Sequence, residues 1–191
     1  GIIGAGTMGN GIAQVCAAAG LSVVMTDISD AAVARGTSVI EKSLERLVNK
    51  QKMSEADRDA ALKRIVGTTD KAKLANCDLV IEAATENEDL KVKILKELCA
   101  SLQPRALLAT NTSSISITKL AAATDRPDRF IGMHFFNPVP LMALLELIRG
   151  LQTSDDTHAK AVDFAKRIGK VAITAKNSPG FAVNRILCPM I

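Results

Sequence analysis

Apolar residues along this chain gather in short continuous runs that are separated by longer, more polar stretches. The runs at residues 22–26, 65–68, 79–83 and 106–110 have the length and character of strands buried on both faces of a parallel sheet. Helices are expected between them, at residues 12–19, over 30–63 with a break before the cap at Ser54, and over 90–102. This alternation predicts an α/β fold with a doubly wound, mainly parallel sheet of the Rossmann type.

Three further apolar runs, at residues 130–135, 144–148 and 171–174, extend the predicted sheet. A Pro-rich reversal at residues 137–141 separates the first two, so we expect them to pair antiparallel and to give the sheet a mixed edge. After the break at residues 178–180, the sequence resembles the first turns of a helix. We therefore expect a sheet domain over residues 1–178, with its first strand truncated at Gly1, and the beginning of a helical C-terminal domain over residues 179–191.

A glycine motif follows the first short apolar stub. Residues 4–9 fit the pattern G-x-G-x-x-G, a helix with apolar spacing follows, and the next strand ends at Asp27, 23 positions after Gly4. In a strand–loop–helix unit, Gly4 permits the tight turn, Gly6 lets the backbone approach a pyrophosphate, and Gly9 allows close helix packing. The free N–H groups at the helix start, near Thr7 and Met8, attract phosphate. The alternative is that these glycines serve only as turn and packing residues.

Asp27 indicates which dinucleotide would bind. A carboxylate at this position accepts hydrogen bonds from the adenine ribose and repels the additional 2′-phosphate of NADP. Neither Ile28 nor Ser29 brings a compensating positive charge. The sequence therefore predicts NAD as the cofactor.

His134 and Glu146 are the best candidates for proton transfer. They flank the Pro-rich reversal, 12 positions apart, so two antiparallel strands would bring the imidazole and the carboxylate together. A histidine that takes a proton needs an acceptor for its other ring N–H, both to fix the tautomer and to offset the charge that forms. The alternative is a buried histidine with a structural role. The other histidine, His158, follows a helix cap and is expected at the surface.

Polar residues also follow two of the predicted strands. Residues 111–114 place hydroxyls and an amide at the carboxyl edge of the sheet, where α/β proteins bind ligands. The same residues can instead cap the helix expected over 117–123, and Ser114 looks the most like a cap. Glu82 and Glu86 follow the preceding strand, where either a contact to the cofactor ribose or a capping role is open.

Lys42, Arg46 and Lys50 recur every four residues along the long predicted helix, with Ser43 and Lys52 nearby. Such a face can hold the phosphates of a nucleotide-bearing substrate. Because Glu41 and Glu45 are interleaved with these cations, a solvated helix face is the alternative.

Composition narrows the class of protein. The chain has 191 residues, a net charge of +4 and neither Trp nor Tyr. Phe is therefore its only aromatic residue, which argues against a single-stranded nucleic-acid binder that needs stacking platforms. The mild positive charge is dispersed and suits a phosphorylated small molecule. Four cysteines form no metal-ligand or disulfide pattern, and no apolar run reaches the length of a membrane span. We expect no metal, no nucleic acid and no membrane, and a cytoplasmic location.

Taken together, the motifs resemble the L-3-hydroxyacyl-CoA dehydrogenase family, especially its short-chain bacterial members. They lie at residues 4–9 with Asp27, 82–87, 111–114, 134–138 with Glu146, and 179–185, in the order and spacing of the family. The resemblance implies hydride transfer between C3 of a 3-hydroxyacyl-CoA, such as 3-hydroxybutyryl-CoA, and NAD. It also implies a helical C-terminal domain through which the full-length protein forms a homodimer.

The resemblance further implies a role for individual residues. His134 would be the catalytic base and Glu146 its partner, while Ser113 and Asn184 would bind the substrate oxygens. The residues implied at the cofactor or the coenzyme A are Asn137 at the nicotinamide–substrate junction, Glu86 with Lys91 as a cofactor-site pair, Ser113 near both groups, and Ser43 with Lys50 on the coenzyme A.

Two other functions fit the same scaffold. One is the related group of gulonate dehydrogenase and lambda-crystallin, which acts on a sugar acid. Lys50 and the basic helix face favour a coenzyme A substrate over a sugar acid. The other is a non-catalytic NAD-binding protein, which would have no need of His134, Glu146, Ser113 and Asn184 together.

Overall fold

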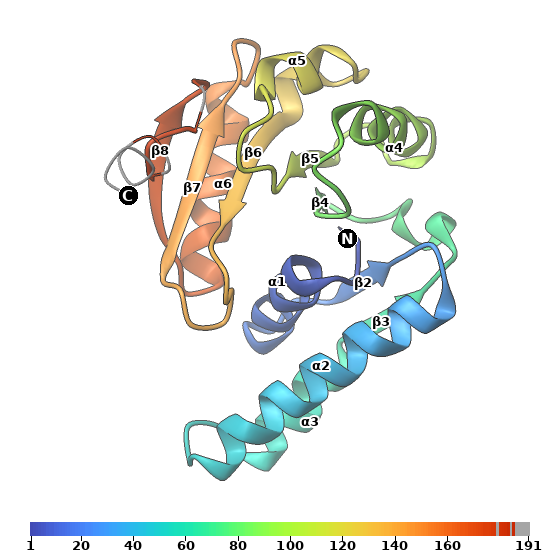
Figure 1. Cartoon of the computed structure of the whole chain (residues 1–191), viewed down its shortest axis with the longest axis vertical. Helices are drawn as coiled ribbons and strands as arrows, with labels where there is room; N and C mark the ends of the chain where they lie inside the picture. The colour runs from blue at the N-terminus through green and yellow to red at the C-terminus, as the bar shows by residue number, and fades with distance from the viewer. Residues whose placement is uncertain (179, 184, 186–191) are drawn as a thin grey trace.

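A single eight-stranded sheet forms the centre of the protein. We describe a computed structural model of the chain over residues 1–178, 180–183 and 185. The strand order is β3-β2-β1-β4-β5-β6-β7-β8 (Figure 1). Their bounds are β1 Ile2–Ile3, β2 Val23–Thr26, β3 Ile65–Thr68, β4 Leu79–Glu82, β5 Leu107–Thr110, β6 Phe130–Phe135, β7 Leu144–Arg149 and β8 Val171–Lys176. The first six strands are mutually parallel and β7 runs antiparallel to β6, so the predicted mixed edge is confirmed.

Helices cover both faces of this sheet and bury a separate apolar core on each. Their bounds are α1 Thr7–Ala18, α2 Asp30–Asn49, α3 Glu55–Lys63, α4 Glu88–Ser101, α5 Ile117–Ala122 and α6 Asp155–Arg167, with short 3-10 turns at η1 Lys71–Leu74 and η2 Pro127–Arg129. Apolar residues of α1, α2, α3 and α6 belong to one core, and those of α4 and α5 belong to the other. This is the doubly wound arrangement that the alternating pattern predicts, and the fold class is confirmed.

Two helix caps expected from the sequence are confirmed, and one is wrong. Ser54 and Ser154 cap α3 and α6, where each hydroxyl accepts a hydrogen bond from a backbone N–H in the first turn. Ser114, however, does not cap α5. The cap is Ser116, whose side chain accepts from the N–H of Lys119, because the chain needs two more residues to turn from β5 into the helix.

The strand order explains where a ligand site can form. β1 lies between β2 and β4, so the chain reverses its direction of progress across the sheet between these neighbours. Loops that follow β1 and β4 therefore diverge to opposite faces and leave a crevice at the carboxyl edge. The glycine motif follows β1, and Glu86 follows β4, so both lie at this reversal.

The structure describes every residue of the helix predicted over residues 181–185 except Asn184. Residues 180–183 form the turn segment that follows β8, and Val183, at its end, and Arg185 are already helical. Gly180 and Phe181 in this segment have φ values of 73° and 51°. Asn184 lies outside the described residues.

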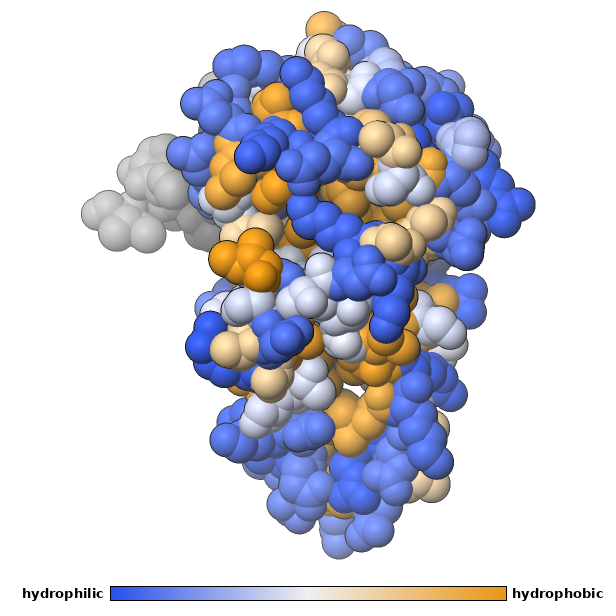
Figure 2. Space-filling view, turned by 90° about the vertical axis from the view of Figure 1, so that its right-hand side faces the viewer, coloured by the Kyte–Doolittle hydropathy of each residue, from blue (hydrophilic) through white to orange (hydrophobic). Residues whose placement is uncertain are grey.

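Hydrophilic residues cover most of the face shown in Figure 2, and apolar residues appear there in separate patches. Within the described ranges, no helix combines the length and the apolar character that crossing a membrane requires.

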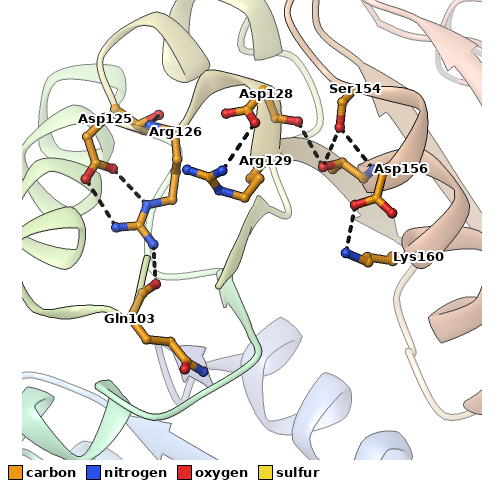
Figure 3. Close-up of polar contacts among 10 residues, drawn as sticks. Gln103, Asp125, Arg126, Asp128, Arg129, Ser154, Asp156 and Lys160 are labelled. Carbon is orange, nitrogen blue, oxygen red and sulfur yellow. Dashed lines mark hydrogen bonds and ion pairs between the residues drawn. The ribbon is translucent and has the colours of Figure 1, made fainter. Parts of the chain in front are cut away.

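A buried arginine fixes the start of β6, at the opposite end of the parallel strands from the glycine motif. Figure 3 shows its contacts to Asp125 and Gln103. Arg126 has a side chain only 2% exposed, and it donates to Asp125 Oδ1 at 2.8 Å and to the carbonyl oxygens of Gln103 at 2.8 Å and Cys99 at 3.2 Å. Two residues later, the carbonyl of Asp128 accepts from the hydroxyl of Thr157 at 2.8 Å. The turn before β6 is thus tied to α4 on one side and to α6 on the other.

The Asp125–Arg126 pair predicts a stability that depends on pH. A hydrogen bond from Arg126 lowers the pKa of Asp125 below its ordinary value of 3.8, so the folded state favours the ionised carboxyl. The stabilisation is therefore present above pH 3.8 and is lost as pH falls through the lower folded-state pKa. Asp125→Asn should cost about 0.5–1 kcal/mol at neutral pH, a small figure because the carboxylate is partly exposed, and the deficit should vanish in strong acid.

Urea unfolding of the wild type and the variant, from neutral pH downward, measures this difference. Asp156→Asn is the matched control, since Asp156 forms an exposed i,i+4 pair with Lys160 and should change stability by only about 0.3–0.5 kcal/mol. A deficit for Asp125→Asn that stays constant into strong acid would contradict the linkage.

Candidate active site

Each glycine of the motif has a different steric reason to be present. Gly4 has a φ of 97°, and a Cβ there would lie 2.7 Å from the Cα of Ala84. A Cβ on Gly9 would lie 1.7 Å from the carbonyl oxygen of Gly4, so only glycine lets α1 start so close to β1. A Cβ on Gly6 would meet nothing within 4 Å. Gly4 and Gly9 are thus required by the fold, whereas Gly6 faces open space that a ligand can approach.

Asp27 braces the glycine loop. Its Oδ2 accepts a hydrogen bond from the N–H of Ala5 at 2.7 Å, and its Oδ1 accepts from Ile28 at 2.7 Å. Each carboxylate oxygen has two lone pairs, so each keeps a further acceptor site for a ribose hydroxyl. The predicted ribose acceptor is thus placed rigidly against the loop that would carry the phosphates.

A cleft of about 420 Å³ opens beside this loop. Residues from both sides of the β1–β2 connection line it, among them Gly6, Thr7, Asp27, Ser29, Arg35 and Val39. The cleft combines the open face of Gly6, the start of α1 and the Asp27 carboxylate, which is the donor and acceptor set that an adenosine diphosphate group requires. The residues present therefore fit the NAD that the sequence predicts.

Arg35 is a cleft residue that the sequence reasoning missed. It lies on α2 with Ala32, Gly36 and Val39, at the i, i+3, i+4 and i+7 positions that share one helix face. That spacing, counted from the cap at Ser29, is the signal that would have found it. Arg35 brings a positive charge to the cleft that Asp27 also lines, a charge that inspection of Ile28 and Ser29 alone does not reveal.

Lys91 lies in a fully buried polar cluster beneath the loop that follows β4. Its Nζ donates to Glu82 Oε2 at 2.5 Å and to Thr110 Oγ1 at 3.2 Å, and the Thr110 hydroxyl in turn donates to Glu82 Oε2 at 2.8 Å. The side chains of Lys91 and Glu82 are 1% and 0% exposed. The structure therefore pairs Lys91 with Glu82, not with Glu86 as the resemblance implied. The cluster joins the carboxyl ends of β4 and β5 to α4.

Glu86 instead organises the polar residues after β5. Its Oε1 accepts from the N–H of Ser113 at 2.8 Å and from the Ser113 hydroxyl at 3.3 Å. Its Oε2 accepts from the Thr112 hydroxyl at 2.7 Å. The structure thus brings two predicted site residues, Glu86 and Ser113, into direct contact between the loops that follow β4 and β5.

His134 and Glu146 face each other across β6 and β7, where they are register partners. The distance from His134 Nδ1 to Glu146 Oε2 is 2.7 Å, and Glu146 has no exposed surface. A carboxylate can only accept, so Nδ1 carries the hydrogen and Nε2 is left as the ring nitrogen for proton exchange. Glu146 Oε1 accepts from the backbone N–H groups of Ala182 at 3.0 Å and Val183 at 2.9 Å, so both oxygens of the buried carboxylate are satisfied.

Two phenylalanine rings enclose the imidazole. Phe136 lies 4.5 Å from it, centre to centre, and Phe181 lies 5.9 Å away in an edge orientation. Behind them, Asn111 Oδ1 accepts from the N–H of Phe135 at 2.8 Å, which fixes the end of β5 to the end of β6. The base candidate therefore sits in a largely apolar wall at the carboxyl edge of the sheet.

The loop after β6 carries Asn137, and a buried lysine holds that loop in place. Lys170 donates to the carbonyl oxygens of Val139 at 2.5 Å and Met142 at 2.7 Å. Burial lowers the pKa of Lys170, which reflects how little water reaches this contact. Asn137 is thus anchored one residue beyond Phe136, near His134 in the chain.

The residues predicted to contact the coenzyme A lie on and next to α2. Ser43 and Lys50 are seven positions apart on α2 and its C-cap, so they share one side of the helix. Lys42 and Arg46 line a groove of about 780 Å³ between α2 and α3, together with Glu45, Asp59 and Arg58. The groove is also lined by Glu41, so its three cations face three carboxylates, two of which, Glu45 and Asp59, bind Arg58; its charge is therefore balanced. His158 donates to or accepts from the Thr174 hydroxyl at 2.8 Å and takes no part in the site.

Comparison with known proteins places this geometry in a family. Residues 1–178 match the model of the family described as 3-hydroxyacyl-CoA dehydrogenase, NAD binding domain. A 3-hydroxybutyryl-CoA dehydrogenase of Bradyrhizobium diazoefficiens is 53% identical over 191 residues, which is all of this chain and 65% of that protein. The fatty acid oxidation complex subunit alpha of a Psychrobacter species is 43% identical over 98% of this chain and 26% of its own.

Solved structures agree with this assignment. The crystal structure of (S)-3-hydroxybutyryl-CoA dehydrogenase from Ralstonia eutropha superposes with a TM-score of 0.98 and is 65% identical, covering 99% of this chain and 67% of its own. The chain thus spans about two thirds of the length of these dehydrogenases. The family match also confirms NAD as the cofactor. The chain belongs to the 3-hydroxyacyl-CoA dehydrogenase family, as its NAD-binding domain.

Proposed function

We propose that the protein to which this chain belongs catalyses the reversible, NAD-dependent interconversion of an L-3-hydroxyacyl-CoA and a 3-ketoacyl-CoA, with 3-hydroxybutyryl-CoA as the preferred substrate. The observation that carries the proposal is the buried His134–Glu146 pair, which stands at the same carboxyl edge of the sheet as the nucleotide cleft. A protein that only binds NAD has no use for such a pair. The names of the relatives support the choice of substrate.

In the proposed mechanism His134 moves the hydroxyl proton. During oxidation, Nε2 takes the proton from the C3 hydroxyl, and Glu146 offsets the positive charge that then develops on the ring. NAD supplies the hydride acceptor at its nicotinamide C4. During reduction, the Nε2–H of His134 returns a proton to the 3-keto oxygen. The two phenylalanines restrict water around the imidazole, which strengthens its interaction with Glu146.

Other residues are proposed to align the reactants. Ser113 and Asn184 would bind the substrate oxygens, and Asn137 would lie at the junction of nicotinamide and substrate. The contact from Glu86 to Ser113 supports this role, because it limits the directions in which the Ser113 hydroxyl can point. Glu86 and Lys91 are proposed to contribute to the cofactor site, Lys91 through the buried cluster that supports the loop after β4.

Ser43 and Lys50 are proposed to contact the coenzyme A. Lys50 is exposed at the C-cap of α2, and among the residues that the structure describes no carboxylate forms an ion pair with it, in contrast to Arg58. We also propose a sheet domain over residues 1–178 that binds NAD, a helical domain that begins within 179–191, and a cytoplasmic homodimer. The free thiols of Cys16, Cys77 and Cys99 agree with a reducing compartment.

The gulonate dehydrogenase and lambda-crystallin group remains the alternative enzyme class. Turnover of acetoacetyl-CoA with NADH, compared with oxidation of gulonate with NAD, separates the two. Activity on gulonate alone would overturn the proposed substrate class and leave the NAD site intact.

NADH should bind the chain more tightly than NADPH does, because Asp27 would repel a 2′-phosphate. Asp27→Asn keeps a carbonyl acceptor for the loop N–H of Ala5 but removes the charge, so it should narrow the preference by about tenfold, or 1–2 kcal/mol. Titration of both nucleotides by fluorescence measures the ratio. Arg35→Ala is the control, since loss of this cation should weaken NADPH further. If the wild type binds NADPH as tightly as NADH or more tightly, Asp27 does not exclude the 2′-phosphate.

His134→Gln should lower kcat by about 10²–10⁴, the usual contribution of a general base, with little change in NADH affinity. Glu146→Gln should also lose activity, because an amide accepts the ring N–H but does not balance an imidazolium. Steady-state kinetics of the full-length protein with acetoacetyl-CoA measures both variants, and His158→Gln is the matched control. Near-normal turnover in either variant would show that the pair is not the proton-transfer machinery.

Lys50→Ala should weaken binding of acetoacetyl-CoA more than binding of a truncated thioester that lacks the nucleotide, because the ammonium acts as a point charge on a phosphate. The difference should shrink at high salt. Lys42→Ala is the control, because Lys42 lines the charge-balanced groove. If both variants weaken both substrates equally, the α2 face is solvated surface.

A further inference from the structure

The turn over residues 180–183 contacts both members of the His134–Glu146 pair. The backbone N–H groups of Ala182 and Val183 converge on Glu146 Oε1, while Oε2 accepts from His134 Nδ1. Because Glu146 has no exposed surface, water cannot take the place of a hydrogen-bond donor that the carboxylate loses, and losing one would cost free energy. The two N–H groups therefore fix the plane of the carboxylate, and that plane sets the direction of the bond to His134.

Phe181 reinforces the same turn. It is 2% exposed, it packs in the core that contains Ile117 and Ile148, and its ring meets the imidazole edge-on at 5.9 Å. Its φ of 51° is in the left-handed region, which residues other than glycine rarely adopt. Such a conformation persists only where the surroundings determine it, and it occurs most often at functional sites. Here the buried ring and the two hydrogen bonds to Glu146 supply that determination.

We propose that the turn over residues 180–183 is a positioning element of the active site, which holds His134 in the tautomer with hydrogen on Nδ1 and in the orientation that exposes Nε2 to substrate. The catalytic value of this positioning rests on the proposed function, whereas the geometric claim does not. Since the turn is where the chain departs from β8, any displacement of this segment relative to β7 acts directly on the base.

Nitrogen-15 NMR of the imidazole rings tests the proposal, because ring nitrogen shifts report the tautomer of a neutral histidine. The chain has only two histidines, so His158, held by Thr174, is an internal reference. Ala182→Pro removes one of the two N–H donors to Glu146, whereas Ala182→Gly retains it. We expect the hydrogen to stay on Nδ1 of His134 in the wild type and in Ala182→Gly, and to divide between both ring nitrogens in Ala182→Pro. Unchanged His134 shifts in a folded Ala182→Pro chain would overturn the proposal.

Amide hydrogen exchange on the unaltered chain gives a second test. This test is valid even if the Ala182→Pro substitution prevents folding. The N–H groups of Ala182 and Val183 should exchange at least about a hundredfold more slowly than in an unstructured peptide, because both are bonded to a buried carboxylate. Exchange at the unstructured rate would overturn the proposal. Neither measurement uses substrate. Failure to turn over 3-hydroxyacyl-CoA would therefore count against the proposed function, whereas the NMR and exchange results alone test whether the turn positions His134.

In the full-length protein, the role predicts a specific kinetic signature. Ala182→Pro should lower kcat by about tenfold or more with KM and NADH affinity little changed, and Ala182→Gly should resemble the wild type. A loss in NADH affinity equal to the loss in kcat would indicate general damage to the fold and contradict a positioning role.

Discussion

The buried carboxylate of Glu146 is the group on which the arrangement of the site depends. A carboxylate without exposed surface is unfavourable unless hydrogen bonds satisfy both oxygens, and the donors come from two separate parts of the chain. One is His134 on β6, and the other is the turn after β8. Both the antiparallel β6–β7 pair and the turn after β8 must form before this carboxylate is fully hydrogen-bonded. The interaction thus links the fold of the sheet edge to the position of His134, the proposed base.

The position of this edge relative to the nucleotide cleft follows from strand order. β1 and β4 lie side by side at the reversal of the sheet, and β5 and β6 follow on one side. The cofactor loop after β1, the Glu86–Ser113 contact after β4 and β5, and His134 on β6 therefore follow one another along the carboxyl edge of the sheet. Buried polar links hold that edge together. Lys91 on α4 bonds Glu82 at the end of β4, and Asn111 after β5 bonds Phe135 at the end of β6. The Arg126 network secures the opposite edge.

Much of this arrangement could be predicted from local sequence, because hydrophobic runs and caps are local signals. The reversal at residues 137–141 gave the antiparallel pairing and brought His134 to Glu146, and the glycine spacing gave the cofactor loop. Contacts between elements carry no such signal. The partner of Lys91 depends on which carboxylate the neighbouring strand buries, and the second contact of Glu146 depends on the path of the chain after β8. The cap of α5 was missed because Ser114 and Ser116 are equally good caps until the length of the turn is known.

The central claim is that His134 Nε2 exchanges the substrate proton. The most direct measurement is a crystal structure of the full-length protein with NAD and acetoacetyl-CoA. The account predicts that the 3-keto oxygen lies within about 2.6–3.2 Å of Nε2, with Nδ1 still bonded to Glu146. A keto oxygen bound to another side chain, with Nε2 turned away from it and out of reach even through a water molecule, would contradict the account.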